Sequence, residues 1–197
     1  MIKAVLLDMG GVLIELDAER QMRAFVGDIP REELWRRWLL SPAVREHEVG
    51  RMSPEDFAAA VLREFGSSAG VDAFLESFHH WIVGPFPGAG ALIDELAARY
   101  RMGLLTNTCA YHWSHPAIAA MAPQFHHVIA SHLAGVIKPD REFFELALTE
   151  CGVTAGEAIF FDDNEINCEG ARACGIEAHR VLGTAALREA LMQRGLL

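Results

Sequence analysis

Several residues that could take part in catalysis or ligand binding lie at or shortly after the ends of short apolar runs in this 197-residue chain. They combine acids, amides, one lysine and glycines. The set consists of Asp8, Gly10, Gly11, Thr106, Asn107, Lys138, Asp162, Asp163, Asn164 and Asn167. Two of its residue types are scarce, because the chain has only two lysines, Lys3 and Lys138, and its three asparagines all belong to the set.

These residue types favour chemistry on a phosphate group. Three carboxylates brought together would raise each other's pKa unless a cation joined them. Oxygen ligands without a nearby histidine or cysteine favour Mg²⁺, which often completes its coordination with a phosphate oxygen. Lys138 would supply a compact positive charge for the same phosphate. Thr106, Asn107 and the flexible Gly10–Gly11 backbone offer hydrogen-bond donors to phosphoryl oxygens.

The elements that must position these residues follow an alternating pattern. Continuous apolar runs of this length indicate buried strands of a parallel sheet, and the segments between them have helical spacing. The expected strands cover 3–7, 102–105, 127–130, 158–161 and 178–182, and the expected helices of this part cover 88–100, 140–151, 165–174 and 184–194. The pattern predicts an α/β fold with a Rossmann-like, doubly wound parallel sheet.

Residues 15–85, called the helical insert below, interrupt the alternation. This stretch shows only helical signals, over 18–26, 30–40, 53–65 and 71–81, and it holds three of the four tryptophans. Ser53 followed by Pro54 is a typical helix start. We therefore expect a core domain of residues 1–14 and 86–197 and a separate helical domain of residues 15–85, placed over the carboxyl edge of the sheet.

Composition excludes several other classes of protein. The formal net charge of −10 argues against nucleic-acid or anionic-membrane partners, which require a basic face. Asp8 interrupts the apolar N-terminus, so no signal peptide is expected, and four cysteines without metal-binding spacing predict reduced thiols in the cytoplasm. The expected partner is a small phosphorylated metabolite, bound by a monomer or homodimer.

The order of the motifs resembles the haloacid dehalogenase-like hydrolases over essentially the whole chain. The first motif is Asp8-Met9-Gly10-Gly11-Val12, the second is Thr106-Asn107, and the third is the lysine of Lys138-Pro139. The fourth runs from Asp162-Asp163 to Asn167. The helical insert is similar to the α-helical cap of this family, which excludes water and selects the substrate.

This resemblance implies a role for each residue. Asp8 is the nucleophile that forms an aspartyl-phosphate, and Lys138 neutralises the phosphoryl group and orients Asp8. Thr106, Asn107, Gly10 and Gly11 bind the phosphoryl group together with Lys138. The expected Mg²⁺ ligands are Asp8, the Gly10 carbonyl, Asp163 and, through water, Asp162. Of the remaining amides, Asn164 is expected to cap the next helix and Asn167 to tune the acids of the fourth motif.

Gly10 departs from the family pattern. Most family phosphatases have an aspartate there, which protonates the leaving alcohol and later activates water. General acid–base help of this kind contributes about 10²–10⁴-fold to the rate. The variant resembles a subgroup that includes α-D-glucose-1-phosphate phosphatases, so we expect a sugar phosphate with a good leaving group. Glu15 and Asp17 are the acids nearest in sequence.

Two alternatives remain open. A haloacid dehalogenase would use the same aspartate to attack carbon, without a metal and without the paired acids Asp162 and Asp163. A catalytically weak relative would bind a phosphorylated ligand or a protein partner without turnover, as the loss of the acid at Gly10 would allow. The histidines lack zinc-binding spacing, although His112 and Trp113 follow the second motif and could line the substrate entrance.

Overall fold

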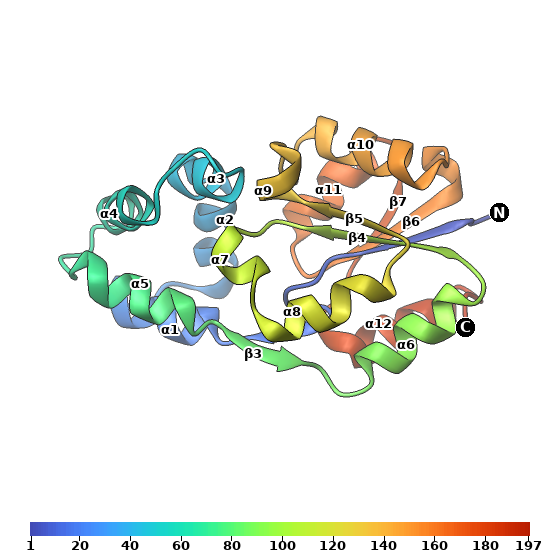
Figure 1. Cartoon of the computed structure of the whole chain (residues 1–197), viewed down its shortest axis with the longest axis horizontal. Helices are drawn as coiled ribbons and strands as arrows, with labels where there is room; N and C mark the ends of the chain where they lie inside the picture. Colours follow the sequence, from blue (N-terminus) through green and yellow to red (C-terminus); the bar gives the residue numbers. More distant parts are fainter.

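A five-stranded parallel sheet forms the centre of the molecule, with strand order β5-β4-β1-β6-β7. The computed structural model describes all 197 residues (Figure 1). The strands are β1 (Ala4–Leu7), β4 (Arg101–Thr106), β5 (His127–Ala130), β6 (Ala158–Asp162) and β7 (Glu177–Arg180). The predicted fold class, a doubly wound parallel sheet, is confirmed.

Helices cover both faces of the sheet because successive strand residues point to opposite sides. In β1, Val5 and Leu7 pack into the cluster with α6 and α12, whereas Ala4 and Leu6 pack into the cluster with α10 and α11. The helices of the two layers are α6 (Ala89–Ala97), α8 (Pro116–Met121) and α12 (Gly183–Gln193) on one face and α10 (Arg141–Cys151) and α11 (Glu165–Ala173) on the other.

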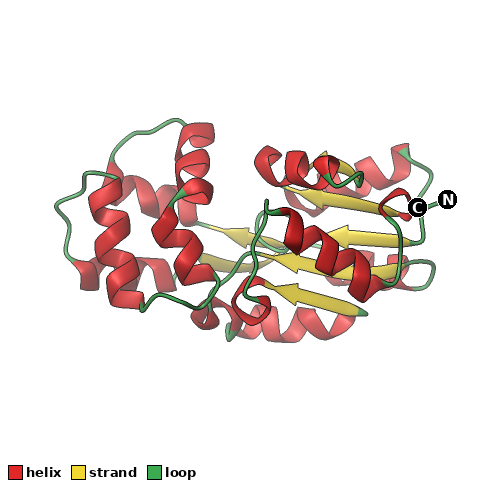
Figure 2. Cartoon of the chain, turned by 90° about the horizontal axis from the view of Figure 1, so that it is seen from above, coloured by secondary structure: helices red, strands yellow, loops and turns green.

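The strand order places a topological switch point beside β1. The chain adds β4 and β5 on one side of β1 and then crosses back to add β6 and β7 on the other. Ligands of open α/β sheets bind at the carboxyl ends of strands at such a point. Figure 2 shows the strand arrows pointing toward the helical insert, so the insert faces this edge.

The helical insert has a hydrophobic core of its own. Trp38, Phe57, Phe74, Phe78 and Trp81 are buried together there. Its elements are α1 (Ala18–Val26), α2 (Arg31–Leu40), α3 (Pro42–Glu48), α4 (Pro54–Glu64) and α5 (Val71–His79).

An antiparallel strand pair joins the insert to the rest of the chain. It consists of β2 (Ile14–Leu16) and β3 (Ile82–Pro85), and Ile14 pairs with Pro85. The pair therefore lies at both boundaries of the predicted helical domain. We propose that the chain divides there into a core of 1–14 with 86–197 and a helical domain of 15–85.

The structure adds elements that the sequence patterns did not predict. They comprise the strands β2 and β3, the helices α3, α7 (Ala110–Trp113), α8 and α9 (Ser131–Ala134), and the 3₁₀ turns Ala122–Gln124 and Ala155–Glu157. Each spans only three to seven residues, which is shorter than the window in which a helical apolar pattern can be recognised. The start of α3 could have been found, since Ser41-Pro42 repeats the signature of Ser53-Pro54 and the Ser41 side chain accepts from the Val44 backbone N–H.

The bounds of other expected elements shift by a few residues. The last strand lies at Glu177–Arg180 instead of 178–182, and the Val181 N–H directly after it still donates to the Asp162 carbonyl of β6. Helix α5 ends at His79, two residues before the expected end at Trp81. No helix has both the length and the apolar character required to cross a bilayer.

Candidate active site

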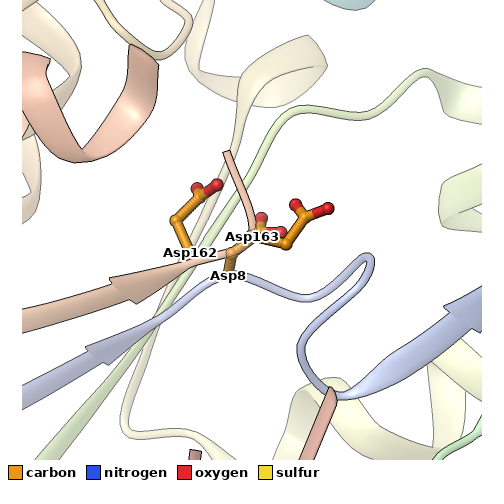
Figure 3. A group of neighbouring side chains, drawn as sticks. All are labelled: Asp8, Asp162 and Asp163. Carbon is orange, nitrogen blue, oxygen red and sulfur yellow. The ribbon is translucent and has the colours of Figure 1, made fainter. Parts of the chain in front are cut away.

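Three aspartates converge at the carboxyl ends of the two central strands. Asp8 follows β1, and Asp162 and Asp163 lie at the end of the neighbouring β6. Each offers a carboxylate oxygen, and these oxygens all lie within 4.8 Å of one another (Figure 3). All three residues are buried. The register that pairs Leu7 with Phe161 brings Asp8 level with Asp162.

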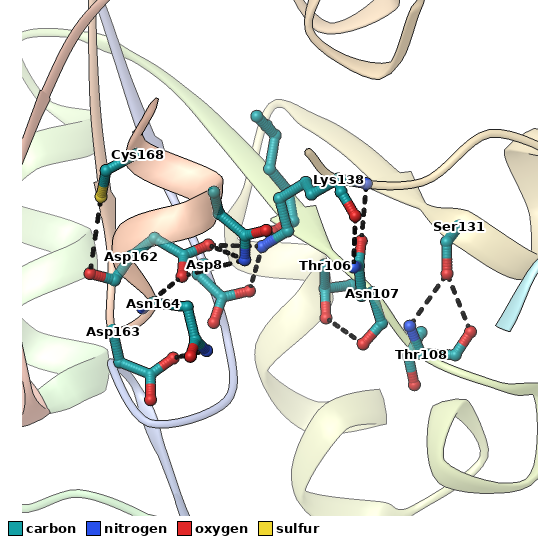
Figure 4. Close-up of polar contacts among 12 residues, drawn as sticks. Asp8, Thr106, Asn107, Thr108, Ser131, Lys138, Asp162, Asp163, Asn164 and Cys168 are labelled. Carbon is teal, nitrogen blue, oxygen red and sulfur yellow. Dashed lines mark hydrogen bonds and ion pairs between the residues drawn. The ribbon is translucent and has the colours of Figure 1, made fainter. Parts of the chain in front are cut away.

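Lys138 joins two of these carboxylates. Its ammonium nitrogen lies 2.6 Å from Asp8 Oδ1 and 2.7 Å from Asp162 Oδ2, and it donates to the Leu105 carbonyl at 2.8 Å (Figure 4). The side chain is only 1% exposed. Three acceptors therefore use the three donors of the ammonium, and its position relative to Asp8 is fixed.

Asn107 holds the backbone of Lys138. Its side-chain amide donates to the Lys138 carbonyl at 3.0 Å and accepts from the Lys138 N–H at 3.0 Å. The Lys138–Pro139 peptide bond is cis. The second and third sequence motifs are thus linked by two hydrogen bonds. The Asn107 side chain is occupied in this link.

Asp162 has no free carboxylate oxygen to offer a metal directly. Oδ1 accepts from the Asn164 N–H at 2.8 Å, Oδ2 accepts from Lys138, and the Asn167 amide nitrogen lies 3.1 and 3.0 Å from the two oxygens. Asn167 therefore orients this acid. Asn164 occupies the N-cap position of α11 without a side-chain capping bond and donates instead to Asp163.

Asp163 connects the core to the helical insert. Its Oδ2 lies 3.5 Å from an Arg31 guanidinium nitrogen at the start of α2, and its carbonyl accepts from Arg180 Nε at 2.9 Å. Gly11 has φ +74°, and a Cβ there would lie 2.6 Å from the Asp163 carboxyl carbon. The glycine is therefore required by both backbone conformation and the close approach of Asp163.

The charges of the site are not balanced by the chain alone. Burial raises the pKa of Asp8 to about 7, against the lowering effect of Lys138. Burial and the neighbouring Asp162 raise the pKa of Asp163 well above its ordinary value. Burial opposes the charge of Lys138, but Asp162 and Asp8 raise the pKa of this lysine. A divalent cation among these oxygens would remove the imbalance, so the donor set fits Mg²⁺.

A cavity of about 510 Å³ opens between this site and the helical insert. The core contributes Asp8, Gly10, Gly11, Asn107, Thr108, His112, Lys138, Asp163, Asn164 and Asn167 to its lining, with Phe86, Leu182 and Gly183. The other lining residues are Glu15, Leu16, Glu19, Arg31, Trp35, Trp38, Leu39, Glu48, Phe78 and Trp81. The cavity thus has a charged floor, and its wall from the insert has four aromatic and four charged side chains.

Most of the expected site residues lie in this cavity. Gly10 and Gly11 line it, and so does Asn107. Thr106 is buried at the end of β4 and does not line it, whereas Thr108 does, although the sequence did not single it out.

The aromatic and histidine residues divide between packing and lining. The three tryptophans of the insert pack in its core and also face the cavity, and the buried Trp35 Nε1 has no hydrogen-bond partner. His112 lines the cavity, but Trp113 does not.

Comparison with known proteins is consistent with this geometry. The family model of the haloacid dehalogenase-like hydrolases matches residues 2–175. The phosphatase MT3486 of Mycobacterium tuberculosis is 28% identical over 98% of this chain and 93% of its own. A D-ribitol-5-phosphate phosphatase of Bacteroides thetaiotaomicron is 24% identical, with 97% of each chain covered.

Solved structures show the same arrangement of elements. A haloacid dehalogenase family enzyme of Bacteroides thetaiotaomicron, solved in complex with magnesium and inorganic phosphate, superposes with a TM-score of 0.67. It is 25% identical, and the match covers 91% of this chain and 94% of that one.

Proposed function

Because the chain belongs to the haloacid dehalogenase-like hydrolase family, we propose that it is a Mg²⁺-dependent phosphatase of a small sugar or polyol phosphate. The observation that carries this proposal is the Asp8 carboxylate, which lines the cavity, is held 2.6 Å from Lys138 and lies beside the two further acids Asp162 and Asp163. The phosphatase relatives support hydrolysis of a phosphate ester.

Asp8 acts as the nucleophile in this proposal. Lys138 binds one of its carboxylate oxygens, which directs the other toward the cavity and the phosphorus atom. Attack forms an aspartyl-phosphate on Asp8 and breaks the bond to the leaving oxygen. Lys138, the Asn107 N–H and the Gly10–Gly11 backbone neutralise and position the transferred group, since phosphoryl transfer depends mainly on positioning and charge.

The residues proposed to hold Mg²⁺ are Asp8, Asp163 and the Gly10 carbonyl, with Asp162 acting indirectly. Asp162 is proposed to act through water because its two oxygens already accept protein hydrogen bonds. A bound Mg²⁺ would supply charge neutralisation to the phosphoryl group. The helical insert is proposed to act as a cap that excludes water.

The cavity wall supports a hydroxyl-bearing substrate. Glu15 and Glu19 line the cavity and offer carboxylates that can accept from hydroxyl groups. A volume of about 510 Å³ is sufficient for a small phosphorylated sugar or polyol.

This function can be tested by measuring phosphate release in the presence of Mg²⁺. The substrates are sugar phosphates, polyol phosphates, nucleotides and an aryl phosphate. We expect release from sugar or polyol phosphates, none after chelation of the metal, and loss of turnover in Asp8→Asn. The conservative variant keeps the size of the side chain and removes the nucleophile. Absence of release from every substrate, or equal release by Asp8→Asn, would overturn the phosphatase proposal. Metal-independent release of halide from a haloacid would instead support a dehalogenase.

A further inference from the structure

Gly10 has no side chain that could protonate the leaving oxygen. The cavity contains one other acid whose position suits this proton transfer. Neither acid closest in sequence fits this role. Glu15 is exposed to solvent, and Asp17, which does not line the cavity, is paired with Arg20 and has a lowered pKa for that reason. Glu19 is paired with Arg23 and Arg31; although burial opposes it, these hydrogen bonds lower its pKa. Glu48 remains.

Glu48 ends helix α3, and two contacts fix this helix to the core. Its backbone carbonyl accepts from Ser131 Oγ at 2.6 Å, and Ser131 Oγ in turn accepts from the Thr108 N–H at 2.9 Å. One turn earlier, Arg45 forms an ion pair with Asp140, two residues after Lys138. The start of the Glu48 side chain is therefore held in place relative to the catalytic floor.

Glu48 lies in the same cavity as the proposed reaction centre. It lines this cavity together with Asp8, Lys138 and Trp38. The charged and titratable groups around it are Asp8, Lys138, Arg45 and Cys109. Burial raises the pKa of Glu48 to about 8, against the lowering effect of Lys138. At neutral pH the carboxyl group thus keeps its proton.

We propose that Glu48, reaching in from the helical insert, is the general acid that protonates the leaving oxygen. This inference rests on the proposed phosphatase function. As Asp8 forms its bond to phosphorus, the bond from phosphorus to the leaving oxygen breaks, and its electron pair stays on that oxygen. The oxygen takes the proton of the Glu48 carboxyl group, so the alcohol leaves neutral and Glu48 becomes a carboxylate.

The same group completes the second half of the reaction. The Glu48 carboxylate takes a proton from a water molecule while the water oxygen attacks the phosphorus of the aspartyl-phosphate. The bond from phosphorus to Asp8 breaks, inorganic phosphate is released, and the Asp8 carboxylate is regenerated. Glu48 regains its proton, so each turnover consumes one water and leaves the protein unchanged.

Glu48→Gln tests the proposal through its dependence on the leaving group. The variant keeps the size and polarity of the side chain but cannot give up a proton. For a polyol phosphate, whose alcohol leaves poorly, we expect kcat to fall by about 10²–10⁴-fold. For p-nitrophenyl phosphate, whose leaving oxygen needs no proton, we expect little change. Adding Gly10→Asp should restore part of the lost rate, because an aspartate at position 10 supplies another acid.

The matched control is Glu46→Gln on the same helix, where Glu46 pairs with Arg51 near the surface. This variant should keep the leaving-group dependence of the wild type. Three results of Glu48→Gln would overturn the role of Glu48 as acid. These are an equal loss of kcat on all substrates, no loss of kcat on any substrate, and a rise in KM confined to hydroxyl-bearing substrates. Failure of the phosphatase function itself is distinguishable, because the wild type would then release no phosphate even from p-nitrophenyl phosphate.

Discussion

At the scale of single residues, the site depends on the balance of one ammonium against three carboxylates. Lys138 donates to Asp8, to Asp162 and to the Leu105 carbonyl, and these three acceptors lie at the ends of neighbouring strands. Removing one partner of a buried ion pair is costly because the other charge is left uncompensated. The lysine therefore stabilises the fold as well as the nucleophile.

Replacement of Lys138 by methionine should affect stability and activity together. Two buried carboxylates would lose their partner, so we expect the free energy of unfolding to fall by about 3–5 kcal/mol. Phosphate release should be lost because Asp8 would no longer be oriented or kept ionised. Urea unfolding and p-nitrophenyl phosphate hydrolysis measure the two effects. Lys3→Met, at the other lysine, is the control, and a fully stable, active Lys138→Met would contradict this reading.

The raised pKa of Asp8 predicts how stability depends on pH when no metal is bound. Its folded value is about 7, above the ordinary 3.8, so the folded state holds a proton that the unfolded state releases. This contribution is fully present below pH 4 and is lost as pH rises through 7. Asp8→Asn lacks it.

Thermal unfolding in a chelator at pH 5 and pH 8 checks this prediction. The wild type should lose stability relative to Asp8→Asn over this interval, and Mg²⁺ should restore the wild type at pH 8 but have less effect on the variant. A stability difference between the two proteins that does not change with pH would show that Asp8 titrates normally.

At the scale of elements, helix α3 is the connection between the insert and the core. Ser131 is fully buried and joins the Glu48 carbonyl to the Thr108 N–H. Three segments distant in sequence, namely the end of α3, the loop after β4 and the start of α9, therefore meet at one hydroxyl group. The position of α3 depends on this contact and on the Arg45–Asp140 pair.

Ser131→Ala should loosen this connection. The Thr108 N–H would be left without its acceptor, and we expect a loss of about 1–3 kcal/mol in the free energy of unfolding. Because Glu48 would be held less firmly, kcat for a polyol phosphate should fall more than kcat for p-nitrophenyl phosphate. Ser114→Ala, at an exposed hydroxyl bonded only to the Tyr111 carbonyl, is the control. Equal effects on both substrates would separate Ser131 from proton transfer.

At the scale of the whole molecule, the net charge of −10 opposes the approach of an anionic substrate. The charge is spread evenly, because the helical insert has 13 acids and 8 bases and the rest of the chain has 14 and 9. The proposed attraction for phosphate must therefore be local, from Lys138, Arg31 and the proposed cation. Beyond about 10 Å, salt at 0.1 M screens the general repulsion.

Ionic strength should therefore raise kcat/KM for a phosphorylated substrate at saturating Mg²⁺. Screening weakens the long-range repulsion of the substrate, while the local contacts of the buried site are screened much less. Steady-state kinetics between low and physiological salt measures this effect, with kcat at saturating substrate as the internal control. A steady fall of kcat/KM with salt would mean that the cavity attracts anions at long range.

The sequence by itself determined the fold class and the identity of the acids at its central edge. Buried parallel strands are continuous apolar runs, and residues that follow them, such as Asp8 and Asp162, must meet at one edge of the sheet. These signals are local or depend only on strand order. The family resemblance assigned roles to the same positions.

Only the tertiary structure decided how each side chain is used. Asn107 holds the backbone of Lys138, Asp162 has both oxygens occupied, and Glu48 lines the same cavity as Asp8 from a seven-residue helix without a clear period. Each of these facts depends on distances between segments far apart in the chain. Periodicity and spacing describe neighbours along the sequence, so they do not contain such distances, and packing of the insert on the core supplies them.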